Sequence, residues 1–123
     1  MDQRTETWKK IKGITRKDTR YKEEAYSFVV AALEETIDGL AEARHVTGGE
    51  LLEGIRRYAM EQFGPMAKEV FNFWGIFTTE DFGHIVFNLV DAGLLSTSES
   101  DSLQDFARGY DFRKIFEEDY FKR

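Results

Sequence analysis

The fold of this chain is decided by residues 45–95, which read HVTGGELLEGIRRYAMEQFGPMAKEVFNFWGIFTTEDFGHIVFNLVDAGLL. Apolar side chains recur in this stretch at the spacing of an amphipathic helix, and start and stop signals divide it into three consecutive helices. We therefore predict a mainly α fold, a compact multi-helix single domain that spans residues 1–123.

The first two of these helices meet at a tight joint. Thr47 and Glu50 have the spacing of a capping box at the start of the first helix. Gly64 ends that helix and Pro65 opens the next, so the chain must change direction sharply. The apolar faces are expected to be Leu51, Leu52, Ile55, Ala59 and Phe63 in the first helix, and Met66, Val70, Phe73 and Trp74 in the short second helix, which stops at Gly75.

The third helix has the cleanest apolar face of the chain. Its cap is formed by Thr78 with Asp81, or by Thr79 alone. Gly93 ends it, and Leu94 can fold back as the apolar partner of a Schellman-type cap. The residues expected on its buried face are Phe82, Ile85, Val86, Leu89 and Val90.

Two further helices precede this block. Residues 5–15 form a short amphipathic helix that buries Trp8, Ile11 and Ile14. Asp18 is the expected N-cap of the next helix, which runs to about residue 36 and ends at or near Gly39. Its apolar stripe consists of Tyr21, Ala25, Phe28, Val29, Ala32 and Leu33.

The pattern weakens after residue 95. Residues 96–102 form a polar turn cluster that could join two short strands in a small C-terminal β-hairpin, or could equally lead into a helix. Asp111 is the expected N-cap of a last helix, with an apolar face of Phe112, Ile115 and Phe116.

Composition limits the compartment and the class of protein. The chain has 33% charged residues and no cysteine. No apolar run approaches the roughly 20 residues of a membrane-spanning helix, and the opening MDQRTETWKK lacks the apolar segment of a secretory signal. We expect a cytoplasmic protein without membrane association.

Charge is divided unevenly along the chain. Residues 1–22 carry +5 and the remainder carries −11, within a net charge of −6. Trp8 and Tyr21 lie among the cations, and this combination could hold an RNA backbone and stack a base. We favour the simpler interpretation, a solvated helix that lies on its own acidic body. The candidate basic patch, in and just after a basic N-terminal helix or arm over residues 1–17, is Lys9, Lys10, Lys12, Arg16, Lys17 and Arg20.

The helix order also suggests a helix-turn-helix-like core. Residues 65–74 would be the support helix, residues 79–92 the recognition helix, and residues 94–107 a wing. The recognition segment contains no Lys or Arg and carries three acidic residues. Because DNA binding depends on cations that meet phosphates, this composition argues against duplex DNA as a ligand.

No stretch carries a catalytic, phosphate-binding or metal-binding motif. The two histidines, His45 and His84, lie on different helix ends, and we expect His84 to be a partly buried structural residue. The sequence therefore predicts no catalytic residue, no metal ligand and no cofactor. Gly54 and Gly83 lie within helical patterns, where each is either simply tolerated or indicates that another backbone passes close by.

Several segments together resemble a known family. They are DTRYKEEAYSF at residues 18–28, the run HVTGGELLEGIRRYAMEQFGPM, then WGI, EDFGHIVFNLVDAGLL and DFARGYDF. Over about residues 14–116 the chain is similar to a family of bacterial conserved hypothetical proteins of unknown function, found mainly in planctomycetes, verrucomicrobia and related lineages. The resemblance implies a bacterial, cytoplasmic, single-domain protein and adds nothing on mechanism. The basic first dozen residues lie outside it.

The sequence favours a non-enzymatic interaction module over an enzyme. An apolar patch near the edges of the buried stripes would contact a protein partner or a second copy of the chain. The candidate residues of this patch are Tyr58, Phe71, Trp74 and Phe77. The alternative is nucleic-acid or ribonucleoprotein binding through the basic N-terminal arm.

Overall fold

The computed structural model describes residues 3–42, 44 and 46–95. Within these residues the chain is mainly helical, as predicted, and contains no strand. The elements are α1 (Gln3–Lys17), α2 (Glu23–Asp38), α3 (Gly48–Phe63), the 3-10 helix η1 (Gly64–Met66), α4 (Ala67–Phe73) and α5 (Thr79–Asp91). The predicted hairpin or wing over residues 94–107 lies outside the described part apart from Leu94 and Leu95, and so does the helix expected after Asp111.

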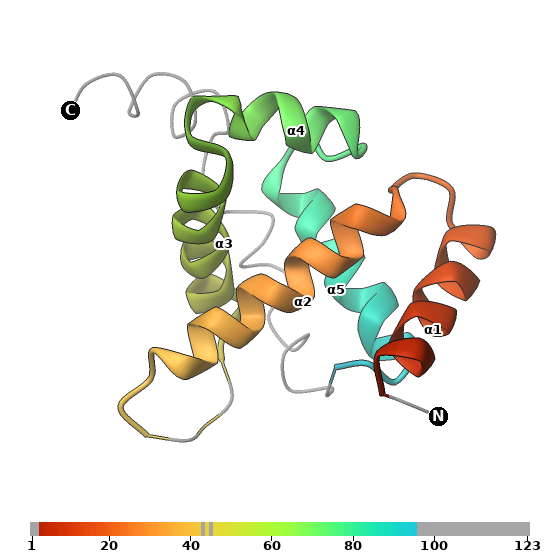
Figure 1. Ribbon diagram of the computed structural model, residues 1–123, viewed down its shortest axis with the longest axis horizontal. Coiled ribbons are helices and arrows are strands. Elements are labelled where there is room, and N and C mark those ends of the chain that lie inside the picture. The colour runs from red at the N-terminus through yellow and green to blue at the C-terminus, as the bar shows by residue number, and fades with distance from the viewer. Residues whose placement is uncertain (1–2, 43, 45, 96–123) are drawn as a thin grey trace.

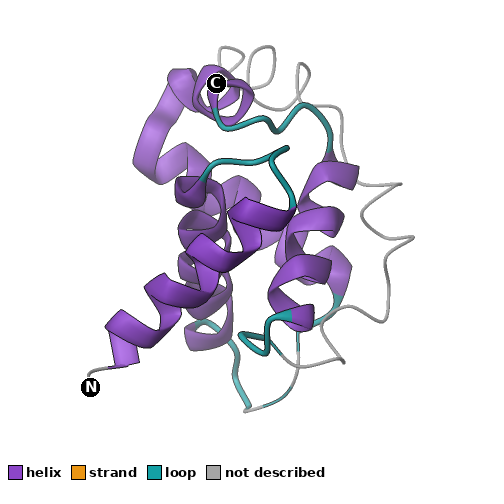
Figure 2. Cartoon of the chain, turned by 90° about the vertical axis from the view of Figure 1, so that its right-hand side faces the viewer, coloured by secondary structure: helices purple, strands orange, loops and turns teal. Residues whose placement is uncertain are grey.

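Helix α2 is the central element of the fold. It crosses the molecule diagonally in Figure 1 and packs against α1, α3 and α5, while α4 lies across one end of α3. Every α-helix contributes to one core, because each has an apolar stripe that faces α2 or its neighbours. Among the described helices none is long and apolar enough to cross a membrane. In Figure 2, α1 runs diagonally across the front of the molecule, on the outside of the bundle.

The local signals at the helix ends are confirmed. Thr47 and Glu50 form the predicted capping box at the start of α3. Thr78 is the N-cap of α5, with the carboxylate of Asp81 reaching back to it. At the other end of α5, the N–H of Leu94 donates to the carbonyl of Leu89, which completes the predicted Schellman-type cap.

The prediction that Asp18 caps α2 is wrong. Helix α2 starts at Glu23, and its N-cap residue Lys22 makes no side-chain capping bond. Instead, the backbone N–H of Lys22 donates to the carbonyl oxygen of Trp74, at 3.1 Å. Tyr21 is therefore in the connection before α2, although it is buried as predicted.

The face of α4 was also predicted wrongly. Its buried residues are Ala67 and Phe71, whereas Met66 and Phe73, which were expected to be inside, are 57% and 70% exposed. Phe71 is fully buried and packs edge-on against Phe82, with ring centroids 5.2 Å apart. The helix is thus rotated about its axis relative to the sequence interpretation.

At Gly54 the close neighbour is a side chain and not, as one of the two alternatives had it, another backbone. A Cβ at Gly54 would lie 1.9 Å from the Oγ1 atom of Thr36 on α2. That hydroxyl is buried and donates to the carbonyl of Ala32 at 2.7 Å. Glycine at this position lets α2 and α3 pack at short distance. Gly83 is also buried.

Candidate functional site

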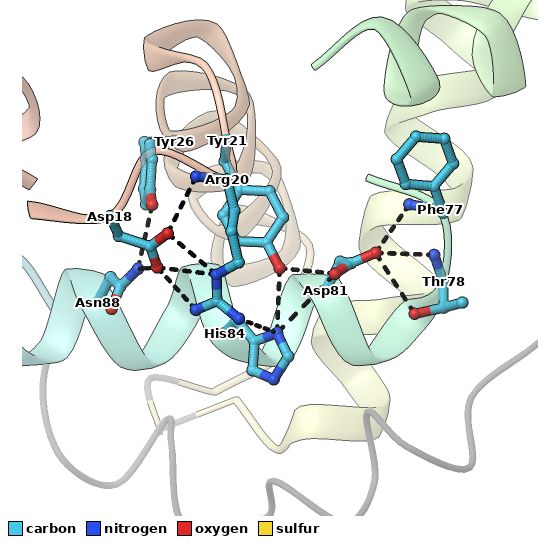
Figure 3. A network of polar contacts seen from close by, with 9 residues as sticks. All are labelled: Asp18, Arg20, Tyr21, Tyr26, Phe77, Thr78, Asp81, His84 and Asn88. Atoms are coloured by element: carbon cyan, nitrogen blue, oxygen red, sulfur yellow. Dashed lines mark hydrogen bonds and ion pairs between the residues drawn. The ribbon is translucent and has the colours of Figure 1, made fainter. Parts of the chain in front are cut away.

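A polar network joins the α1–α2 connection to α5 (Figure 3). The carboxylate of Asp18 accepts from the backbone N–H of Arg20 at 3.0 Å and from its guanidinium at 2.7 Å. It also accepts from Nδ2 of Asn88 on α5, at 2.9 Å, and the same amide reaches the hydroxyl of Tyr26 at 3.1 Å. Because these donors stabilise the charged form, with Arg20 the strongest, the pKa of Asp18 lies well below its usual range.

The second half of the network centres on Tyr21. Its hydroxyl donates to Oδ1 of Asp81 at 2.6 Å and lies 3.0 Å from Nδ1 of His84. Burial, and then the hydrogen bond to Asp81, raise the pKa of Tyr21 far above its usual value, so the hydroxyl remains a donor. Nη1 of Arg20 lies 3.2 Å from the same His84 nitrogen. A guanidinium has only donors, so Nδ1 accepts in this geometry.

The network stabilises the fold. The other oxygen of Asp81 accepts from the backbone N–H groups of Phe77 and Thr78, which fixes the start of α5. His84 has a side chain that is 39% exposed, and its contacts match the structural role predicted for it. Within the described residues no group of three His, Cys, Asp or Glu side chains is placed to hold a metal ion. Because the contacts of Tyr21 with Asp81 and of Asp18 with Asn88 join segments far apart in the chain, we assign these contacts a structural role.

The four candidate patch residues do not form one exposed surface. Phe71 is fully buried, so its inclusion in a surface patch is corrected. Tyr58 and Trp74 are half-buried and pack around Phe28, at centroid distances of 5.2 and 5.6 Å. Only Phe77 is strongly exposed, at 61%.

Three exposed apolar side chains lie at the ends of α4 or a few residues beyond it. We refer to Met66, Phe73 and Phe77, with the partly buried Trp74, as the α4 apolar surface. Met66 is the N-cap residue of α4 and Phe73, seven positions later, is its last residue, so helical spacing places the two on the same side. The Nζ atom of Lys22 lies 4.9 Å from the centroid of the Phe73 ring, which places a cation at the rim.

The candidate basic patch is divided among three places. Lys9, Lys12 and Arg16 follow one another at helical spacing on the exposed side of α1. Lys10 and Lys17 line a groove between α1 and α5. Arg20 belongs to the polar network described above.

Trp8 accompanies the first of these groups. Its side chain is 44% exposed, although it was expected in the core, and the Nζ atom of Lys12 lies 5.5 Å from its ring centroid. Of the three residues that were predicted to be buried in α1, Ile11 and Ile14 are buried and hold the inner side of the helix against the core. An aromatic ring and cations therefore share the outer face of this helix.

No protein-family model, curated protein or solved structure matches this chain. The function must therefore be argued from the surfaces of the described residues. Two surfaces remain after the structural roles are assigned, the α4 apolar surface and the basic outer face of α1.

Proposed function

We propose that this chain is a non-enzymatic module of the bacterial cytoplasm that binds a protein through the α4 apolar surface. The observation that carries the proposal is that α4 is apolar on two opposite sides. Ala67 and Phe71 face the core, while Met66 and Phe73 face outward. Folding requires only one apolar face of a helix, so the second face is available to a partner.

The energetic argument concerns the exposed aromatic rings. Complete burial of a Phe side chain stabilises by about 1.5–3 kcal/mol relative to exposure. Phe73 and Phe77 obtain little of this in the isolated chain, because they are 70% and 61% exposed. A partner that covers both rings would gain this burial free energy at the interface, where aromatic residues commonly dominate the binding energy.

Affinity capture with matched variants tests the proposal. The tagged chain, the double variant Phe73→Ser/Phe77→Ser and the control Phe87→Ser are incubated with nuclease-treated lysate of the source organism, and captured proteins are identified by mass spectrometry. Phe87 is 54% exposed but lies on α5, so the control removes a comparable ring elsewhere. We expect a specific protein that the double variant loses and the control retains. Equal capture by all three would contradict the proposal.

Self-association is the second form of the same proposal. A second copy of the chain would bury the same surface, so sedimentation velocity would show a concentration-dependent dimer. The double variant would then remain monomeric at concentrations where the Phe87→Ser control dimerises. If the wild-type chain is monomeric, the partner is a different protein.

A second candidate function is nucleic-acid or ribonucleoprotein binding through α1. The observation in its favour is the exposed Trp8 ring beside Lys12 and Arg16 on the outer face of α1. We do not place nucleic-acid binding on α5, although α4 and α5 follow one another in helix-turn-helix order. Helix α5 contains no Lys or Arg.

Charge reversal on one helix separates the two candidates. Lys12→Glu/Arg16→Glu changes the outer face, and Lys10→Glu/Lys17→Glu makes the same charge change on the other side of α1. If RNA binds to the outer face, the affinity for a fluorescent single-stranded RNA falls steeply as the salt concentration rises. The Lys12→Glu/Arg16→Glu variant should then weaken this affinity far more than the Lys10→Glu/Lys17→Glu variant. Equal effects would indicate unspecific attraction and would count against an RNA site.

A further inference from the structure

A groove of about 270 Å³ runs between α1 and the C-terminal half of α5. The two helices lie side by side there. On the α1 wall, Lys10, Gly13, Ile14 and Lys17 follow at helical spacing and so form one stripe. Asp18 also lines the groove just after this stripe, with its carboxylate paired with Arg20. The volume is slightly below the usual range for drug-sized ligands, which fits a small metabolite.

The α5 wall carries the opposite charge. Asp91 and the amide of Asn88 face the lysine stripe across the groove. Nδ2 of Asn88 is held by Asp18 and by Tyr26, so the polar network fixes this side chain in place. Its Oδ1 atom has no hydrogen-bond partner within the described part of the chain, and remains an available acceptor.

The opposite charges across the groove do not meet. The ion pairs formed by the described residues include none of the three charged side chains Lys10, Lys17 and Asp91. All three side chains are exposed, so water screens their charges from one another. The groove therefore has positive charges on its α1 wall and a negative charge on its α5 wall. This arrangement is complementary to a ligand that carries one charge of each sign.

Gly13 supports a role for the open space. A Cβ at this position would meet no atom within 4 Å, and its backbone is an ordinary helical one. The fold therefore does not require glycine here, although glycine in a helix costs about 1 kcal/mol relative to alanine. Its absent side chain leaves room in the groove wall beside Ile14.

We propose that this groove binds a small zwitterion of the free amino-acid class. The ligand carboxylate lies between Lys10 and Lys17, and its ammonium group donates to Asp91 and to Oδ1 of Asn88. Its side chain rests over Gly13. This inference is independent of the proposed protein-binding function, because it uses neither the α4 apolar surface nor the outer face of α1.

Three probes with one carbon skeleton test the charge requirement. L-leucine carries both charges, 4-methylpentanoate lacks the ammonium group, and isoamylamine lacks the carboxylate. Each is titrated into the isotope-labelled full chain, and the amide resonances of Gly13, Asn88 and Asp91 are followed by NMR. We expect saturable shifts with L-leucine at a Kd of about 1 mM or tighter. Each singly charged analogue should bind at least about tenfold more weakly.

Variants locate the binding in the groove. Gly13→Leu fills the space and should abolish the shifts at Asn88 and Asp91, while thermal unfolding stays at or above the wild-type temperature. Lys17→Gln should weaken L-leucine at least about fivefold, whereas Arg16→Gln, next to it but outside the groove, should leave the Kd unchanged. The proposal is overturned if L-leucine gives no saturable shift, if an analogue binds equally well, or if Gly13→Leu still binds.

Discussion

The contact between Gly54 and Thr36 gives the sharpest test of the packing of α2 against α3. In Gly54→Ala the new Cβ would lie 1.9 Å from Oγ1 of Thr36 and 3.1 Å from its Cβ. Rotation of the Thr36 side chain offers little relief, because its Cγ2 atom is also within 3.4 Å of the new methyl group. The helices must therefore move apart.

Two opposing effects set the magnitude. Alanine favours a helix over glycine by about 1 kcal/mol. Overpacking of a well-filled core costs about 1–3 kcal/mol, and a contact this short belongs at the upper end. We expect Gly54→Ala to lower the free energy of unfolding by about 2 kcal/mol, equivalent to a fall in Tm of about 8 °C for a chain of this size.

A double-mutant cycle assigns the loss to this one contact. Thr36→Ala removes Oγ1 and Cγ2, and by itself should cost about 1 kcal/mol of lost burial. In that background Gly54→Ala should be neutral or stabilising, so the coupling free energy between the two positions should be about 2 kcal/mol. Urea unfolding followed by circular dichroism measures all four proteins.

Gly13→Ala is the matched control, since it is the same substitution in a helix with open space at the new methyl group. It should raise the free energy of unfolding by up to about 1 kcal/mol. If Gly54→Ala is as stable as the wild type, or if Thr36→Ala fails to rescue it, the packing argument is refuted.

Three further substitutions test individual interactions. Hydrogen bonds, above all from Arg44, lower the pKa of Glu50 from 4.5 to about 2; the Tm deficit of Glu50→Gln should therefore be present at neutral pH and disappear as pH falls from about 4.5 towards 2. Gly75 has a φ of +93°, and a Cβ there would lie 2.1 Å from a backbone carbonyl oxygen, so Gly75→Ala should lose more than about 1–2 kcal/mol in urea unfolding. Tyr21→Phe removes the hydrogen bond to Asp81 and should cost about 1–2 kcal/mol by the same measurement.

The sequence predicted helix ends well and long-range contacts poorly. Both capping boxes and the turn at Gly93 depend on residues within six positions of one another, so a local pattern contains them. The Asp18 carboxylate, by contrast, is held by Asn88, 70 residues further along the chain. A polar residue before a helix has the same local appearance whether it caps that helix or reaches across the fold.

The short helix α4 shows a second limit of periodicity. Met66, Val70 and Phe73 have helical spacing, and so do Ala67, Phe71 and Trp74. Because the helix has two equivalent apolar stripes, its periodicity does not say which one is buried; packing against the rest of the fold decides. Phe71 packs against Phe28 and Phe82, so its stripe is the buried one. The stripe with Met66 and Phe73 stays exposed as part of the α4 apolar surface.

The basic charges of the N-terminal segment have a different role in the fold from the one that the sequence suggested. The sequence interpretation placed it on the acidic body of the chain, and α1 does pack there. It does so through the buried side chains of Ile11 and Ile14. The ion pairs formed by the described residues involve neither Lys12 nor Arg16. Docking of α1 therefore leaves Lys12 and Arg16 outside the ion pairs of the described residues, and these two cations are the ones that an anionic partner would contact.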